Sequence, residues 1–369
     1  MAAAASSPRR VLLACDWFLK YVGPFAEALA RAGADVAVLF RDHAHEFGGS
    51  ESERREVLDG MAAAGVTLLE LPGRSTSLTP AVLRAMRQAR RFRPDVVHAQ
   101  SEIHDLRLLL ATLGPPLALM VHDPELHVGT PRRPLHLRAI AALWQRRADL
   151  LLAHGERLAH DLGTRKPVRI IPHGMVARDA PLAPPAEPTL LLFGRLEYYK
   201  GVRLLLAAMP HVWAERPEVR LIVAGRGSEV GLVPTDDPRI SLDDRYIPEE
   251  GIDELFARAS LAVLPYLDAS QSGVGLVALG RGVPIVVTDV GELPSLVRDP
   301  SFVAPPNDPV ALAGRLLAHL DHDLAFRRAV LDDARAAFGW DAVAQRALRI
   351  YDELAAARGS QVAPAAETA

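Results

Sequence analysis

One short segment contains the residue types that a diphosphate site needs. It reads Phe193-Gly194-Arg195-Leu196-Glu197-Tyr198-Tyr199-Lys200-Gly201, and a helical pattern over Val202–Val212 follows it. Gly194 permits a tight turn off the preceding apolar run, so Arg195 and Lys200 place two cations where a strand meets a helix. Cations beside a helix N-terminus attract phosphate oxygens. The alternative is a loop with two solvated charges; the rarity of lysine in this chain favours the functional interpretation.

A second polar group, His122-Asp123-Pro124-Glu125-Leu126-His127, follows an apolar run over Leu117–His122. A metal site at His122, Asp123 and His127 is one interpretation. An irregular loop without the i, i+4 spacing of helical ligands makes it the weaker one. A histidine and an aspartate that cap a turn are a further alternative.

Short apolar runs alternate with helical patterns along the whole chain, which predicts parallel sheets covered by helices. The predicted strands are Val11–Cys15, Asp35–Phe40, Val66–Leu71, Val96–Ala99, Leu117–His122, Leu150–Ala153, Val168–Ile171, Thr189–Phe193, Val219–Ala224, Ile240–Asp243, Leu261–Pro265 and Ile285–Thr288. The predicted helices include Val22–Ala32, Pro80–Arg91, Leu135–Arg147 and Val202–Val212. Such an α/β pattern favours two Rossmann-like domains that face a central cleft, with ligands at the carboxyl ends of the strands.

A stretch rich in Pro and Ala, Ala177–Pro188, separates the two halves of this pattern and is typical of a linker. The predicted organisation has five parts: a Rossmann-like domain over 1–178, a linker over 179–188, a second Rossmann-like domain over 189–340, a helix over 341–358, and a disordered tail over 359–369.

Composition limits the class of protein. The 369 residues are 49% hydrophobic and 24% charged with a net charge of −3, which fits a globular protein. A single cysteine excludes internal disulfides, and neither a secretory signal nor a membrane-spanning run is present. We therefore expect a cytoplasmic protein. The first half carries an excess of basic residues, which leaves open a weak contact with the inner face of the membrane. No motif indicates nucleic-acid binding.

The segment Gly194–Gly201 resembles the G-R-L-x-x-x-K-G signature of family-4 retaining glycosyltransferases, whose fold is called GT-B. Further segments match this family in order and spacing over about residues 8–355: Ile171-Pro172-His173-Gly174, Ala224-Gly225-Arg226-Gly227, Tyr246-Ile247-Pro248, the run from Gly282 to Gly291, and Phe338-Gly339-Trp340. The similarity is strong in the second half and weak in the first.

The resemblance implies that the domain over 1–178 binds the acceptor, that the domain over 189–340 binds the nucleotide sugar, and that the helix over 341–358 crosses back to the first domain. It also implies a role for each matching position. Arg195, Lys200 and His122 would be catalytic, with His122 beside the donor sugar. The residues that would bind the donor are Gly194, Gly225, Tyr246, Ile247, Gln271, Ser272, Gly273 and Val274. Gly23, in a loop poorer in glycine than the family's, and Asp123 would bind the acceptor.

One departure from the family concerns its two glutamates. An alignment without insertions places them at Ala269 and Val277, and the glycine between them at Ser272. The roles of these carboxylates cannot be transferred to this chain. The turn Gln271-Ser272-Gly273 remains, and its backbone N–H groups can hold phosphate or sugar oxygens. It is similar to a Q-S-G variant of some bacterial members.

The resemblance implies sugar transfer, with retention, from a nucleotide diphosphate sugar (UDP or GDP) to a hydroxyl acceptor on a glycan, a linked lipid or a natural product. No cofactor or divalent metal is then required, because two cations stabilise the leaving diphosphate. An alternative is a silent protein that only binds nucleotide sugars. A nicotinamide-dependent oxidoreductase is disfavoured, since Cys15-Asp16-Trp17-Phe18 replaces the glycine-rich turn after the first strand.

Overall fold

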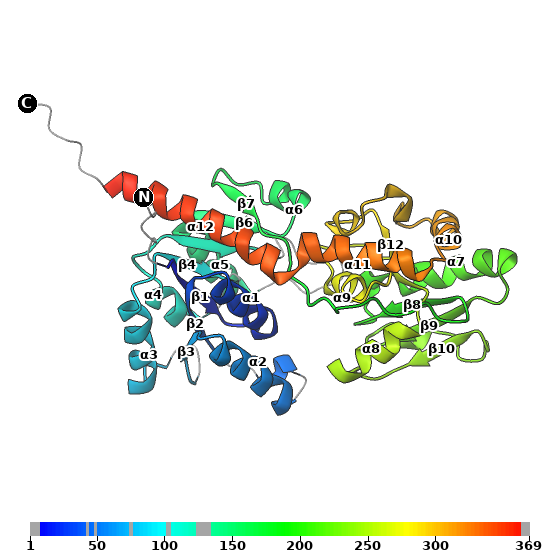
Figure 1. The fold of residues 1–369 in the computed structure, drawn as a ribbon, viewed down its shortest axis with the longest axis horizontal. Coiled ribbons are helices and arrows are strands. Elements are labelled where there is room, and N and C mark those ends of the chain that lie inside the picture. Colours follow the sequence, from blue (N-terminus) through cyan, green and yellow to red (C-terminus); the bar gives the residue numbers. More distant parts are fainter. Residues whose placement is uncertain are drawn as a thin grey trace, which may run out of the picture.

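The computed structural model describes residues 8–41, 44–47, 50–73, 77–100, 105–122 and 134–362. Two parallel sheets lie side by side in it, one in each half of the chain (Figure 1). The first has strand order β3-β2-β1-β4-β5-β6-β7 and the second β10-β9-β8-β11-β12-β13. This arrangement confirms the predicted α/β fold of two Rossmann-like units.

The first sheet is buried on both faces because helices cover each of them. Its strands are β1 (Arg10–Cys15), β2 (Asp35–Phe40), β3 (Thr67–Glu70), β4 (Val96–Ala99), β5 (Leu117–Met120), β6 (Leu150–Ala153) and β7 (Val168–Ile170). Its helices are α1 (Leu19–Arg31), α2 (Glu51–Ala63), α3 (Pro80–Arg91), α4 (Leu106–Ala111), α5 (Leu135–Arg147) and α6 (Glu156–Asp161). The inner strands hold mostly apolar, buried runs without alternation, as a doubly covered parallel sheet requires.

The second sheet repeats this plan with a different set of helices. Its strands are β8 (Thr189–Phe193), β9 (Arg220–Ala224), β10 (Ile240–Asp243), β11 (Leu261–Leu264), β12 (Ile285–Thr288) and β13 (Val303–Ala304). Its helices are α7 (Val202–Glu215), α8 (Glu249–Ala257), α9 (Gly273–Leu279), α10 (Pro309–Ala318) and α11 (Leu324–Phe338). One core lies between the sheet and α7 and α10, the other beneath α8 and α9.

The chain returns to the first domain through α12 (Trp340–Val362), drawn in red in Figure 1. Where α11 meets α12, the Met175 N–H donates to the Phe338 carbonyl at 2.8 Å. A Cβ on Gly174 would lie 2.2 Å from the Trp340 ring, so only glycine fits. Ala344, Ala347 and other apolar residues of α12 join the core of the first domain.

Three details differ from the sequence-based expectations. Helix α1 begins at Leu19, three residues before the predicted start, so Pro24 lies inside the helix and not in its first turn. Helix α12 continues to Val362, into the segment predicted to be a disordered tail. Strand β13 was not predicted, because two residues carry no readable period.

Contacts also join the two domains directly. Asp289 and Glu292 follow β12 and meet the start of α6 in the first domain. Arg157 lies 2.6 Å from Asp289, and the backbone N–H of Leu158 donates to the buried carboxylate of Glu292 at 2.7 Å. Together with α12, these contacts fix how the carboxyl ends of the two sheets approach each other.

Candidate active site

Tight backbone packing shapes the loops that leave β8, β9 and β11. Gly194 and Gly225 have φ of +120° and +130°, a region that favours glycine. A Cβ on Gly225 would lie 1.9 Å from the Gly194 carbonyl oxygen, and one on Gly201 would lie 1.8 Å from that of Pro265. These approaches hold the Gly194–Gly201 segment against the neighbouring strand ends, so that its two cations have defined positions.

Lys200 and Arg195 lie at this junction beside two tyrosines. Lys200 Nζ lies 3.8 Å from the centre of the Tyr266 ring and 5.2 Å from that of Tyr199, and an Arg195 nitrogen lies 3.4 Å from the Tyr199 hydroxyl. Burial, with a smaller contribution from nearby Arg195, lowers the pKa of Lys200 to about 8. Within the described part of the chain, neither cation forms an ion pair with a carboxylate.

The turn before α9 lies next to this pair of cations. The Ser272 hydroxyl caps α9 by accepting from the Gly275 N–H at 3.3 Å, and it lies 3.0 Å from the Tyr266 hydroxyl. Gly273 borders open space, whereas Val274 packs on Gly194. The structure therefore brings the predicted donor residues of this turn together with Gly194 and Lys200, and uses the Ser272 side chain as a helix cap.

The positions aligned with the family's glutamates are apolar and packed. Ala269 is buried and Val277 contacts the core beneath α9. Tyr246 is 53% exposed, whereas Ile247 is buried in the same core. Of these two predicted donor-binding residues, only Tyr246 therefore has a solvent-exposed side chain that a ligand can contact.

His122 follows β5 and lies at the boundary between the domains. Its Nε2 lies 2.7 Å from the carbonyl oxygen of Gln100, and its Nδ1 lies 3.4 Å from the Gln271 side-chain nitrogen of the second domain. Phe18 stacks on the imidazole with 4.4 Å between ring centres. His122 thus touches the donor turn, whereas Asp123 and His127 lie outside the described residues.

The sequence patterns did not indicate Gln100 and His154. Each directly follows a strand, Gln100 after β4 and His154 after β6, and each contacts His122, His154 at 3.1 Å. The rule that ligands gather at the carboxyl ends of parallel strands would have pointed to both. Gly23, in contrast, lies inside α1, where an added Cβ would meet Val57 of α2 at 2.5 Å. Its contact with an acceptor stays a prediction.

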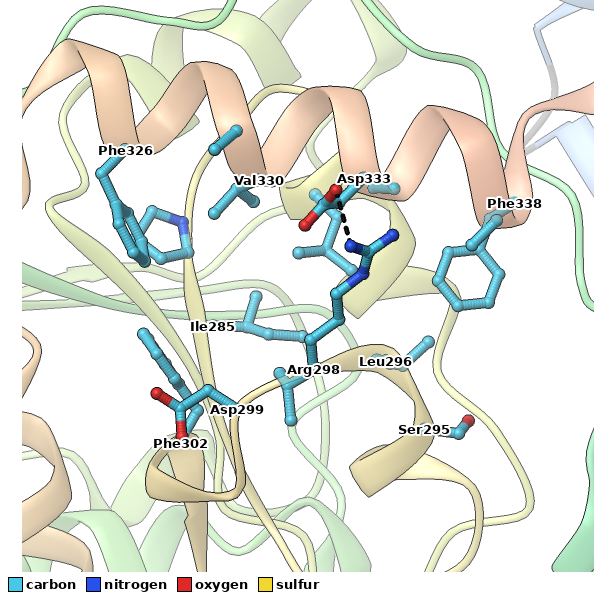
Figure 2. A pocket seen from close by; sticks show the side chains of 16 residues that line it. Ile285, Ser295, Leu296, Arg298, Asp299, Phe302, Phe326, Val330, Asp333 and Phe338 are labelled. Carbon is cyan, nitrogen blue, oxygen red and sulfur yellow. Dashed lines mark ion pairs between the residues drawn. The ribbon is translucent and has the colours of Figure 1, made fainter.

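Of two cavities in this region, one borders the donor turn. A small one of about 20 Å³ lies between the domains and is lined by His154, His173, Gln271, Ser272 and Glu292 among others. A second of about 440 Å³ lies beneath α11, where Arg298 and Asp333 form an ion pair of 3.0 Å over an apolar floor (Figure 2). None of the predicted site residues lines this second cavity.

Two negative findings apply to the described residues. No group of three or more histidine, cysteine, aspartate or glutamate residues is placed to hold a metal ion. None of the helices in these segments has the length and apolar character needed to cross a membrane.

Comparison with known families agrees with this geometry. The family described as Glycosyltransferase Family 4 matches residues 20–177, and Glycosyl transferases group 1 matches residues 187–322. The fold and these adjoining matches define a GT-B glycosyltransferase, an enzyme of the hexosyltransferase type. More narrowly, the chain belongs to the family-4 glycosyltransferases.

Individual relatives share the whole length or half of it. A glycogen synthase of Mycobacterium tuberculosis strain H37Rv is 28% identical over 93% of this chain and 92% of its own length. A D-inositol 3-phosphate glycosyltransferase of Segniliparus rotundus is 32% identical over 49% of this chain and 42% of its own length.

Two solved structures share the fold. The sucrose-phosphate synthase of Thermosynechococcus elongatus is 19% identical with a TM-score of 0.68, covering 95% of this chain and 100% of its own. Anabaena HepE, solved with UDP and glucose, is 17% identical with a TM-score of 0.65, covering 93% and 99%.

Proposed function

We propose that this enzyme transfers a sugar from a nucleotide diphosphate sugar, with UDP or GDP as the nucleotide, to a hydroxyl of a glycan, lipid-linked or natural-product acceptor. The main support is the pair Arg195 and Lys200. These two cations lie at a strand end, and no carboxylate among the described residues forms an ion pair with them. A half-buried lysine without a counter-ion among the described residues is costly unless an anion binds there. The complexes of HepE with UDP and UDP-glucose support UDP as the first nucleotide to test.

We further propose that transfer proceeds with retention by attack on the face of the leaving group. The bond between the anomeric carbon and the phosphate oxygen breaks, and that phosphate oxygen accepts the proton of the acceptor hydroxyl. Arg195 and Lys200 stabilise the charge that gathers on the diphosphate. Since Ala269 and Val277 replace the family's glutamates, the aligned positions supply no carboxylate for a double displacement. Neither a cofactor nor a divalent metal is needed in this scheme.

The first experiment is calorimetric titration with UDP, GDP, ADP and dTDP. Selective binding of one nucleotide that is lost in Arg195→Ala and Lys200→Ala supports the site. Arg216→Ala, an exposed arginine at the far end of α7, is the matched control and should bind as the wild type does. Equal binding by the two site variants and the wild type, or no binding to any of the nucleotides, would contradict the proposal.

A catalytically silent binder is the second candidate, favoured by the apolar residues at 269 and 277. Release of nucleoside diphosphate from the bound donor, with any acceptor or with water, distinguishes an enzyme from a silent binder. NMR of the first sugar released tests the stereochemistry, because retention gives the anomer of the donor before mutarotation mixes the two.

The site of action is proposed to be cytoplasmic, with a weak peripheral contact at the membrane and none with nucleic acid. Helix α3 buries Val82, Met86 and Ala89 in the core and exposes Arg87 and Arg90. Any contact would therefore be electrostatic, with no apolar face to insert. Sedimentation with anionic vesicles at low salt, lost at high salt, is the expected result; sedimentation that salt does not alter would contradict it.

A further inference from the structure

Buried polar side chains form a continuous chain across the carboxyl ends of β4, β5 and β6. His122 Nε2 lies 2.7 Å from the Gln100 carbonyl oxygen. His154 Nδ1 lies 2.9 Å from the Ile171 carbonyl oxygen. His154 Nε2 lies 3.1 Å from His122 Nδ1, which is also 3.4 Å from the Gln271 side-chain nitrogen. Both histidines are at most 8% exposed.

These distances determine where the protons lie. A carbonyl oxygen can only accept a hydrogen bond, so His122 Nε2 and His154 Nδ1 must each carry a hydrogen. The Gln100 side-chain nitrogen also lies 3.3 Å from His122 Nε2, but the 2.7 Å contact with the carbonyl is the closer and fixes this tautomer. In two neutral rings the facing nitrogens would then both present lone pairs, which repel. One further proton between the rings would turn this 3.1 Å contact into a hydrogen bond.

We propose that His122 and His154 form a dyad that takes up one shared proton when the nucleotide sugar binds, so that His154 positions His122 and adds a positive charge to the donor side of the cleft. The inference rests on the proposed function. A series of contacts links the dyad to the phosphate site: Gln271 touches His122, Ser272 beside it touches Tyr266, and Lys200 lies over the Tyr266 ring.

Protonation of the dyad needs the bound ligand, because the groups around the two histidines disfavour a positive charge there. Burial first, and then the neighbouring His122 and His173, lower the pKa of His154 well below its usual range. Four ionisable groups face the two histidines: His98 of β4, Tyr21 of α1, His173 after β7 and Glu292. The Glu292 carboxylate already accepts a hydrogen bond from the Leu158 N–H. Burial lowers the pKa of His98 to about 3 and that of His173 to about 4, so both are neutral at neutral pH.

A bound diphosphate reverses this balance by adding negative charge next to the donor turn, which favours the protonated dyad. The proton uptake is therefore a property of binding and needs no catalytic turnover. Lys200 contributes little to it at about pH 7, because a pKa of about 8 leaves it mostly protonated there.

Calorimetric titration with UDP-glucose and with GDP-mannose at about pH 7, in phosphate and in Tris buffer, tests the proposal. The two buffers differ in their heat of ionisation, so proton uptake appears as a difference between the observed enthalpies. The pyrophosphate of a nucleotide sugar does not titrate near this pH. We expect uptake approaching about one proton per binding event in the wild type.

His154→Gln is the decisive variant, because the glutamine amide can donate to His122 Nδ1 without titrating. It should still bind the donor, and its enthalpy should become the same in both buffers. His160→Gln, on the solvent side of α6 with a 91% exposed side chain, should keep the wild-type uptake.

Two results would overturn the dyad alone: binding by the wild type with equal enthalpies in both buffers, or uptake that persists in His154→Gln. If neither nucleotide sugar binds at all, the proposed donor site fails and the dyad fails with it.

Discussion

Lys200 lies with its ammonium 3.8 Å from the centre of the Tyr266 ring, whose hydroxyl reaches the cap of α9. The cation is thereby held over a buried aromatic face, close to Arg195 and away from water. A cation–π contact offsets part of the lost hydration but does not neutralise the charge. This arrangement makes the protonation of Lys200 sensitive to pH in a range that experiments reach.

The first prediction concerns this pH dependence. Donor binding needs the protonated form of Lys200, and burial lowers its pKa to about 8, so in His154→Gln, where the proposed dyad does not titrate, affinity should be full below that pH and fall as the pH rises through it. The loss should approach about tenfold per pH unit above about 8. Calorimetric dissociation constants for UDP between about pH 6 and pH 10 measure this.

Lys200→Arg is the control for that profile, because arginine stays charged throughout the range. In the same His154→Gln background its affinity should be lower at neutral pH, since a planar guanidinium fits the site differently, but flat across the range. A profile without a decline in His154→Gln alone, or the same decline once Lys200→Arg is added, would assign the titration to another group.

The second prediction concerns backbone packing. Gly201→Ala should destabilise the protein by about 4 kcal/mol or more and abolish donor binding, because the new Cβ would lie 1.8 Å from the Pro265 carbonyl oxygen at a φ of +71°. Gly33→Ala is the matched control: its φ is +93° with nothing within 4 Å of the added atom, so it should lose only about 1–2 kcal/mol. Urea unfolding measures both, and equal losses would refute the role of the close approach.

The third prediction concerns the contact between the domains at α6. Glu292→Ala leaves the Leu158 N–H without its acceptor and should cost about 1–3 kcal/mol, whereas Arg157→Ala removes a half-exposed ion pair worth about 0–1 kcal/mol. Hydrogen exchange over residues 155–162 should accelerate in Glu292→Ala and little in Arg157→Ala. Glu292→Gln, which keeps an acceptor oxygen, should exchange nearly as the wild type does. Exchange that is equally slow in all three variants would show that the contact carries no stability.

The sequence was most informative where burial is complete. Strands such as Asp35–Phe40 and Ile285–Thr288 were predicted to the residue, because a parallel strand covered on both faces is an unbroken apolar run between polar turns. Sequence patterns failed to predict the start of a helix where contacts with distant residues determine it. Phe18, with φ of +75°, begins α1 earlier than the apolar pattern indicates.

The site shows the same division. Arg195 and Lys200 were found because glycines and charges at a strand end carry their own signal. His154 was not, since one histidine after an apolar strand is common. Its importance comes from a 3.1 Å contact with His122, 32 positions away in the chain.

The last prediction concerns Arg327 of α11, a fully buried arginine. Its guanidinium donates to the carbonyl oxygens of Leu182, Ala183, Ala259 and Ser260, and so ties the predicted linker to the start of β11. Arg327→Lys keeps a charge but cannot reach oxygens on both sides, so it should leave buried carbonyls unpaired and cost about 2–4 kcal/mol.

Arg328→Lys is the neighbouring control, since this exposed residue makes one contact, with the Asp179 carbonyl oxygen. Its midpoint of unfolding in urea should stay within error of the wild type. Arg327 contacts the linker and the segment before β11, and none of the predicted donor residues. Donor affinity in Arg327→Lys should therefore persist at low temperature, while the midpoint of unfolding in urea drops. A variant as stable as the wild type would mean that the linker is held by its prolines alone.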